Sequence, residues 1–394
     1  MDASNTFLLA RRARWAVAAV FLVNGFMVGS WAPHIPLVMA RLGITESTMG
    51  MLIFCFGIGA LLSMPWCGWL MARFGERAVL RTFGLIQGTG LLLVVLSPDV
   101  WTTAVAMVAF GAMVGCTDVA MNAATVSVER RLGKAVMSSM HGFWSLGGFA
   151  GSALGGILLQ NTGAVAHAAL VAVVAISVGL LCFANFLPTI GEAKPAGTPR
   201  EPFRLPKSPI VYLLGVVALF VFVSEGAVLD WGALYMSQER GAGIAVAGFA
   251  YAFFAGAMAV MRFAGDAVRD RFGAVRTMRV SSLVATVAML AASLLPTPTL
   301  VIAAFFIAGL GVANTVPIAF SAAGNQPGIS VGTAMSVVTT MGYAGILLAP
   351  SSIGVIGEHT GFSPVFMAMA GLLFVTFLMS PLVAAADAKP SGGH

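Results

Sequence analysis

Two ionisable side chains stand out because they lie within long apolar stretches of the sequence. Asp118 and His141 both fall in the glycine-rich region 111–156, on either side of a short basic loop at 129–134. A carboxylate inside a membrane-spanning helix costs about 2.5–3.5 kcal/mol even on a lenient insertion scale, so it usually faces a bundle interior or a water-filled path. We therefore interpret Asp118 as a proton carrier or an acceptor for substrate hydroxyls. A structural carboxylate that bonds a neighbouring helix is the alternative.

Asp118 also belongs to a stripe of small and polar residues that recur at intervals of three and four positions. On a helix such residues share one face. The stripe therefore predicts one wall of a polar cavity. Its members are Gly111, Gly115, Asp118, Asn122 and Thr125.

Other apolar stretches carry further ionisable residues. Glu225 lies well inside its stretch and is a second candidate for a proton or substrate site, whereas Asp230 lies nearer the end and suits a gate or a solvated position. His141 shares a helical face with Ser145, and two interpretations stay open for it: a proton relay and a structural histidine. A hydrolytic Ser–His pair would need a third partner and an oxyanion hole, and the sequence suggests neither.

Arg262 and Asp266 are spaced four residues apart in another apolar stretch. On a helix this spacing suits a salt bridge. We expect this pair to stabilise one conformation of the protein. A direct contact between Arg262 and a substrate is the alternative.

Aromatic rings, amides and hydroxyls recur near the middle of several apolar stretches. This mixture suits a polyhydroxylated ring, because aromatic faces stack on its C–H face while amides and carboxylates bond its hydroxyls. We predict that the following residues line a substrate cavity: Asn24, Trp31, Asn122, Trp144, Ser145, Tyr251, Asn314 and Tyr343.

The composition sets the class of protein that must position these residues. Hydrophobic residues make up 59% of the 394-residue chain and charged residues only 9%, against about 25% charged in typical soluble domains. Apolar runs of about 20 residues, the length that crosses a bilayer core, recur along the chain. We predict an all-α membrane protein with 12 transmembrane helices, near 15–37, 48–71, 79–97, 100–127, 136–159, 165–187, 209–236, 245–268, 275–295, 299–323, 332–356 and 362–384.

The loops predict the domain organisation and the orientation. Residues 188–208 are rich in Pro, Gly and charge, so we expect a cytoplasmic linker between six-helix halves at 1–187 and 209–394. All but three of the 21 basic residues fall on the side of the termini, the exceptions being Arg41, Arg240 and Arg262. The positive-inside rule then places both termini in the cytoplasm. Basic charge confined to these loops argues against a nucleic-acid partner.

The two halves also repeat each other in sequence. Residues 137–163 align with 335–361 at a constant offset of 198, and Arg73-Phe74-Gly75 aligns with Arg271-Phe272-Gly273 at the same offset. Asp118 corresponds to Asn314. Two similar halves imply a pseudo-twofold axis along the membrane normal, with the substrate path between them.

These features resemble the major facilitator superfamily. Its conserved loop after the second span is similar to the turn around Arg73 and to Asp270-Arg271-Phe272-Gly273, although Ala72 stands where the family usually has an aspartate. The resemblance implies that Arg73, Asp270 and Arg271 help to lock one conformation. Asp118–Asn122, His141–Gly148 and Glu225–Trp231 are similar to fucose permease relatives, especially the YbjJ-like and rhizopine-transport (MosC-like) branch. Those relatives couple protons through acids in spans one and four, but span one here offers Asn24.

Together the residues and the resemblance predict a secondary transporter rather than an enzyme. We expect proton-coupled movement of a small polar solute, sugar-like or cyclitol-like, by alternating access of the two halves; proton-coupled efflux of drugs or metabolites is the alternative. Asp118, Glu225 and His141 are the candidates for proton coupling. We expect a monomer in the bacterial inner membrane, with no cofactor and no bound metal.

Overall fold

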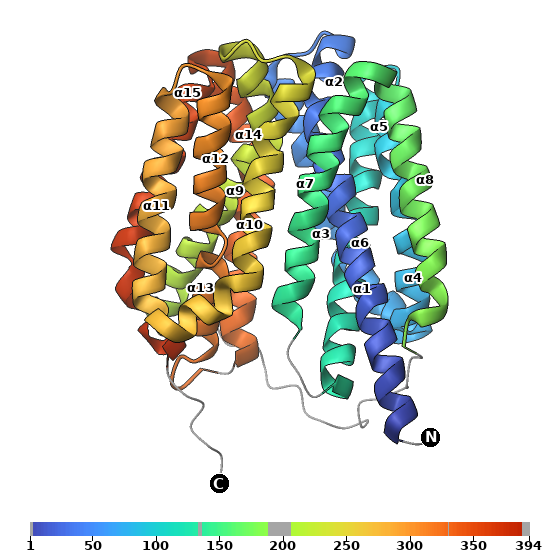
Figure 1. The fold of residues 1–394 in the computed structure, drawn as a ribbon, viewed down its shortest axis with the longest axis vertical. Coiled ribbons are helices and arrows are strands. Elements are labelled where there is room, and N and C mark those ends of the chain that lie inside the picture. Colours follow the sequence, from blue (N-terminus) through green and yellow to red (C-terminus); the bar gives the residue numbers. More distant parts are fainter. Residues whose placement is uncertain (1–2, 133–135, 188–205, 330, 388–394) are drawn as a thin grey trace.

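The computed structural model describes residues 3–132, 136–187, 206–329 and 331–387, and every regular element in these ranges is a helix (Figure 1). The predicted linker therefore lies largely outside the described residues. The first half contains α1 (Ala3–Trp31), η1 (Ala32–His34), α2 (Ile35–Leu42), α3 (Glu46–Phe74), α4 (Glu76–Ile86), η2 (Gln87–Thr89), α5 (Gly90–Leu96), α6 (Val100–Leu132), α7 (Met137–Thr162), α8 (Ala164–Cys182) and η3 (Phe183–Asn185). The second half contains α9 (Pro209–Glu239), α10 (Ile244–Phe272), α11 (Ala274–Leu294), α12 (Pro298–Val312), α13 (Thr315–Gly324), α14 (Val331–Thr360), α15 (Phe362–Leu378) and η4 (Ser380–Asp387).

The described helices confirm the predicted all-α membrane protein. Eleven helical segments are long and apolar enough to cross a bilayer, and α15 with η4, bent by 51°, makes a twelfth. Three spans differ from the continuous helices we expected. The first is interrupted at η1, the third at η2, and the tenth between α12 and α13.

Local sequence explains these interruptions. Pro33 lies in η1, and Pro36 is the second residue of the helix that follows it. Pro317, in the first turn of α13, has no N–H to bond the carbonyl of Ala313, so the preceding helix ends there. Gly88 and Gly90 flank Thr89 at the end of η2, and glycine weakens helix continuity.

Three pairs of tight turns confirm the internal repeat. Each pair has a glycine in the first half and a glycine 198 positions later in the second half, and both members have a positive φ that favours glycine. The pairs are Gly43 and Gly241 (φ 62° and 66°), Gly75 and Gly273 (83° and 80°), and Gly163 and Gly361 (83° and 78°). The twin Arg-Phe-Gly segments thus form matching turns.

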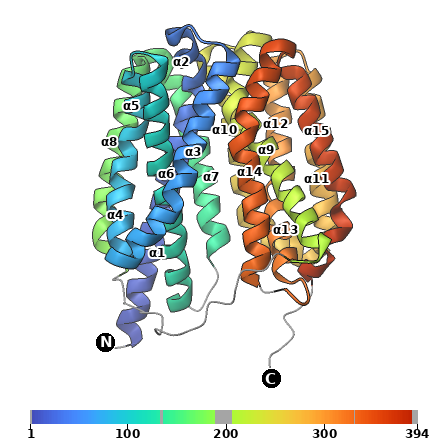
Figure 2. The same cartoon turned by 180° about the vertical axis from the view of Figure 1, so that it is seen from behind.

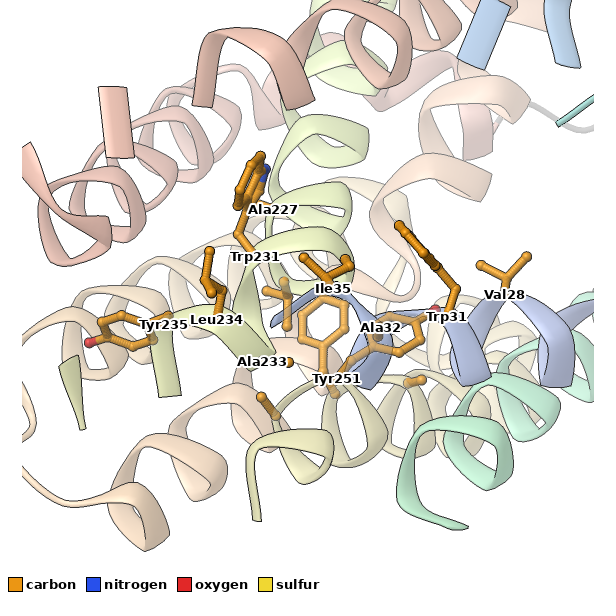
Figure 3. Close-up of a cluster of buried hydrophobic side chains, with 14 of the residues drawn as sticks. Val28, Trp31, Ala32, Ile35, Ala227, Trp231, Ala233, Leu234, Tyr235 and Tyr251 are labelled. Carbon is orange, nitrogen blue, oxygen red and sulfur yellow. The ribbon is translucent and has the colours of Figure 1, made fainter. Parts of the chain in front are cut away.

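Both termini lie at one end of the bundle, which we call the terminal end; the opposite end is the distal end (Figure 1). The hydrophobic core differs between them. At the distal end one continuous cluster includes side chains of both halves, such as Trp31, Ile35, Trp231 and Tyr251 (Figure 3). Towards the terminal end each half has a separate cluster, one around Phe21 and Met121, the other around Val217 and Met278. The buried core is therefore shared distally and divided between the halves towards the terminal end, where Phe143 of one half still packs edge-on against Phe263 of the other at 5.6 Å between ring centroids.

Two pairs of long helices lie side by side across the boundary between the halves: α7 beside α10 (Figure 1) and α3 beside α14 (Figure 2). At the distal end α2 also contacts α9. The distal ends of the long helices approach closely. A Cβ atom added at Gly354 would lie 2.5 Å from the carbonyl oxygen of Glu46. Polar bonds complete the contact: the Ser47 N–H donates to Glu358 Oε2 at 3.1 Å, and Gln238 Nε2 donates to Glu46 Oε1 at 2.8 Å. We call this packed region, with the shared core, the distal seal.

Within the first half, α1 and α7 cross at very short range. A Cβ added at Gly25 would lie 2.0 Å from the carbonyl oxygen of Trp144, and one added at Gly147 would lie 2.0 Å from that of Leu22. Only glycine allows two backbones to approach in this way. The crossing brings Asn24 of α1 against Trp144 of α7.

Candidate functional site

Arg262 connects the two halves near the point where they part. From α10 it donates through Nη1 to Ser145 Oγ of α7 at 2.5 Å, and its Nη2 lies 3.8 Å from Glu225 Oε1 of α9. Glu225 is near the middle of its helix, 16 residues after Pro209 and 14 before Glu239. The side chains of Arg262 and Glu225 are only 14% and 15% exposed. A buried cation, a carboxylate and a hydroxyl from three spans therefore meet here.

The predicted pairing of Arg262 with Asp266 stays a prediction, since the side chain of Asp266 lies outside the described residues. The contacts that are described for Arg262 reach other helices. An i, i+4 rule considers one helix at a time, so sequence reasoning missed the pairing of Arg262 with Glu225.

Asp118 lies on the opposite half, near the middle of α6. Asn122, one turn further along, donates through Nδ2 to the Asp118 backbone oxygen at 2.8 Å and to Oδ1 at 3.3 Å. Tyr343 of α14 is close enough for its hydroxyl to interact electrostatically with the Asp118 carboxylate. Its ring packs edge-on against Phe222, with centroids 6.2 Å apart. The Asp118 carboxylate and the Tyr343 hydroxyl thus lie within electrostatic range of each other across the two halves.

Asn24 and Trp144 form part of a buried hydrogen-bond chain. Trp144 Nε1 donates to Asn24 Oδ1 at 2.9 Å, and Asn24 Nδ2 donates to Gln87 Oε1 at 3.0 Å. Asn24 is only 1% exposed, whereas Trp144 is half-buried. Sequence reasoning missed Gln87, although a glutamine between apolar residues in span three was a visible signal.

Trp31 and Tyr251 belong to the distal seal (Figure 3). Tyr251 reaches from α10 to α7: a Cβ added at Gly148 would lie 3.3 Å from its hydroxyl oxygen. Asp230 is also buried, and its carboxylate, like that of Glu225, interacts electrostatically with the Tyr251 hydroxyl. These residues therefore lie between the central acids and the distal end.

Three histidines have structural contacts. His141 packs edge-on against Phe21 at 5.3 Å between ring centroids, and it lies within electrostatic range of Arg262. His34 and His167 form a buried pair, with Nε2 of the first 2.8 Å from Nδ1 of the second. This pair fixes η1 against α8 beneath the distal seal, and nothing in the spacing of the two histidines had suggested it.

The remaining predicted residues lie elsewhere. Asn314 sits in the break between α12 and α13, where a Cβ added at Gly265 would lie 2.1 Å from its Oδ1, so it packs against α10. Arg73, Asp270 and Arg271 are exposed at the terminal end. The guanidinium of Arg73 lies over the Trp69 ring at 5.6 Å. Their role as a conformational lock stays a prediction.

Comparison with known families decides the identity of the fold. The sequence profile of the Major Facilitator Superfamily matches residues 17–328 and 231–394. The chain belongs to the major facilitator superfamily. It is 36% identical to an uncharacterized MFS-type transporter of Yersinia pestis, over 90% of this chain and 91% of that protein. It is also 29% identical to membrane protein MosC of Rhizobium meliloti, over 88% of this chain and 84% of that one, which confirms the predicted relationship to the MosC-like branch.

Solved structures of the superfamily share the fold. The nucleoside transporter NupG superposes with a TM-score of 0.71 at 14% identity, over 96% of this chain and all of NupG (100%). A D-xylose-proton symporter gives a TM-score of 0.70 at 14% identity, over 95% of this chain and 97% of the symporter. The helix arrangement of these superfamily structures therefore extends over nearly the whole chain.

Proposed function

We propose that this superfamily member is a proton-coupled secondary transporter of a small polar solute, sugar-like or cyclitol-like. The observation that carries the proposal is the placement of two membrane-embedded acids, Asp118 and Glu225, on opposite halves near the place where the halves part. Intramembrane carboxylates usually mark ion or substrate paths. A carboxylate that gains and loses a proton changes the charge of the path, and so can couple solute movement to a proton gradient.

The asymmetry of the bundle supports alternating access as its mechanism. The shared core and the bonds of the distal seal close one end, whereas the buried core is divided between the halves towards the other. Since most basic residues of the described ranges lie towards the terminal end, we assign that end to the cytoplasm of a bacterial inner-membrane protein. The structure then corresponds to an inward-facing state of a monomer, and rocking of the two six-helix halves would produce the outward-facing state.

The side chains around the two acids support a hydroxylated solute. Trp144 offers a half-buried ring, and Asn122, Asp118, Tyr343 and Glu225 offer hydrogen-bonding groups. Such a set suits a ring with several hydroxyls. The fold relatives named above carry nucleosides and D-xylose according to their descriptions, and both solutes contain a hydroxylated sugar.

A thermal-shift screen of the purified protein tests this solute class. The panel contains D-xylose, D-galactose, L-fucose, myo-inositol and uridine, with cationic amphiphilic drugs as the contrasting set. We expect a sugar, cyclitol or nucleoside to raise the melting temperature. At a concentration of 100 times its Kd, the bound solute adds about 2.7 kcal/mol to the free energy of unfolding. The stabilisation should disappear in a Tyr343→Ala variant. Stabilisation by cationic drugs alone would instead support efflux of drugs or metabolites.

A further inference from the structure

We propose that Gln87 is a positioning residue for the solute site: acting through Asn24, it fixes the indole ring of Trp144 at the point where the halves part. Gln87 is fully buried in η2, the interruption of the third span. It lies behind Asn24 in the chain of hydrogen bonds and does not itself face the path. The inference rests on the proposed function in one respect, that Trp144 provides the surface on which a sugar-like ring stacks.

The chain of hydrogen bonds has a single possible direction. Indole Nε1 is only a donor, so the Asn24 oxygen must face Trp144 and the Asn24 amide nitrogen must face Gln87. At the other end Gln87 Nε2 donates to the backbone oxygen of Gly84 at 3.4 Å, and that oxygen is only an acceptor. Both amides are therefore held in one orientation by fixed groups at the two ends.

Burial makes each bond of this chain costly to lose. Asn24 is 1% exposed and Gln87 is fully buried, so water does not replace a missing partner easily. An unsatisfied buried donor or acceptor costs about 1–3 kcal/mol. Removing the Gln87 amide would leave the Asn24 nitrogen without its acceptor, and the Asn24 amide would no longer be held towards Trp144.

Trp144 occupies a position where its orientation matters. Its ring packs against both the core shared by the halves and the separate core of the first half. The next residue, Ser145, accepts the bond from Arg262 of the other half. The backbone around Trp144 is held against Gly25 at the close α1–α7 crossing. With the backbone held, only the side-chain torsion angles of Trp144 can change, and the hydrogen bond to Asn24 fixes them.

Asn24 then has a role different from the solute contact predicted from sequence. Its amide bonds Gln87 and Trp144 and is only 1% exposed, so it transmits orientation rather than binding the solute.

Fluorine NMR of the full chain labelled with 5-fluorotryptophan tests the proposal without any solute. The Trp144 resonance is assigned by its loss in Trp144→Phe. We expect Gln87→Leu and Asn24→Ala to shift and broaden this resonance. The matched control is Gln326→Leu, because Gln326 is also a buried glutamine and, among the described residues, its side chain bonds the Ala322 oxygen of its own segment; it should leave the Trp144 resonance in place.

Gln87→Glu is the rescue variant. Its carboxyl group keeps an oxygen that can accept from Asn24 Nδ2, which Gln87→Leu removes. The Trp144 resonance of Gln87→Glu should therefore lie closer to that of wild type than the resonance of Gln87→Leu does. An unchanged Trp144 resonance in Gln87→Leu, or a Gln87→Glu resonance displaced as far as that of Gln87→Leu, would overturn the proposal. Failure of the solute screen would count against the proposed function and leave these spectra interpretable.

Discussion

Replacing Asp118 by asparagine should abolish accumulation of solute against its gradient, while exchange of solute across the membrane continues. A proton carrier must change its charge when the path opens to the other compartment, and an amide of the same shape cannot. Coupling to one proton supports about a tenfold accumulation for each pH unit of gradient, since one pKa unit corresponds to 1.36 kcal/mol. The variant should lose this tenfold accumulation entirely, so that the solute concentration inside the vesicles rises only to that outside.

Asn314→Ala is the matched control for that experiment. Asn314 occupies the corresponding place in the second half, is already neutral, and packs against α10. Its replacement should change apparent affinity at most and leave the response to pH intact. Accumulation by Asp118→Asn at the wild-type ratio would mean that Asp118 is a structural carboxylate bonded by Asn122, and the coupling assignment would be wrong.

Replacing Arg262 by glutamine should be almost as damaging, for a different reason. The substitution leaves the Glu225 carboxylate without the guanidinium at 3.8 Å and removes the charged donor to Ser145. Breaking one partner of a buried ion pair costs about 3–5 kcal/mol; the 14–15% exposure of these side chains places the expected loss near the lower end. Transport should fall at least tenfold, and the purified protein should melt at a lower temperature.

The double variant Arg262→Gln/Glu225→Gln separates charge from shape. If the harm of Arg262→Gln comes from an uncompensated carboxylate, removing that carboxylate should restore much of the lost melting temperature, as a double-mutant cycle would show. Ser145→Ala serves as the control, because it keeps the ion pair and removes only the hydroxyl. Strictly additive melting-temperature losses in the double variant would contradict an interaction between Arg262 and Glu225.

Features governed by local composition were predictable from the sequence. Apolar run length gave twelve spans, and the constant offset of 198 gave the repeat that the paired glycine turns now confirm. The acids Asp118 and Glu225 were conspicuous because lipid rejects charge. Each of these signals is carried by a single segment, or by two segments compared directly.

Features that depend on how spans meet were not predictable. The pairing of Arg262 with Glu225, the contact between His34 and His167, and the chain from Gln87 to Trp144 all join residues on different helices. Their geometry is set by close crossings such as Gly25 against Trp144, which fix which faces touch. Helix periodicity gives the face of one helix but not its neighbour.

The sequence also does not predict whether the bundle faces inward or outward. Both an inward-facing and an outward-facing arrangement bury the same apolar faces within each half, so hydropathy does not distinguish them. The distinction lies in contacts between halves, such as those of Glu46 with Gly354 and Gln238 at the distal end.

Proton-driven uptake into proteoliposomes tests the central claim most directly. The purified wild-type chain is reconstituted with an internal pH of 8 and diluted to an external pH of 6, in the presence of whichever radiolabelled member of the sugar, cyclitol and nucleoside panel stabilises it. The account predicts accumulation well above the external concentration, and its collapse when a protonophore is added. Uptake that reaches only the external concentration, or accumulation that the protonophore leaves unchanged, would contradict proton-coupled transport.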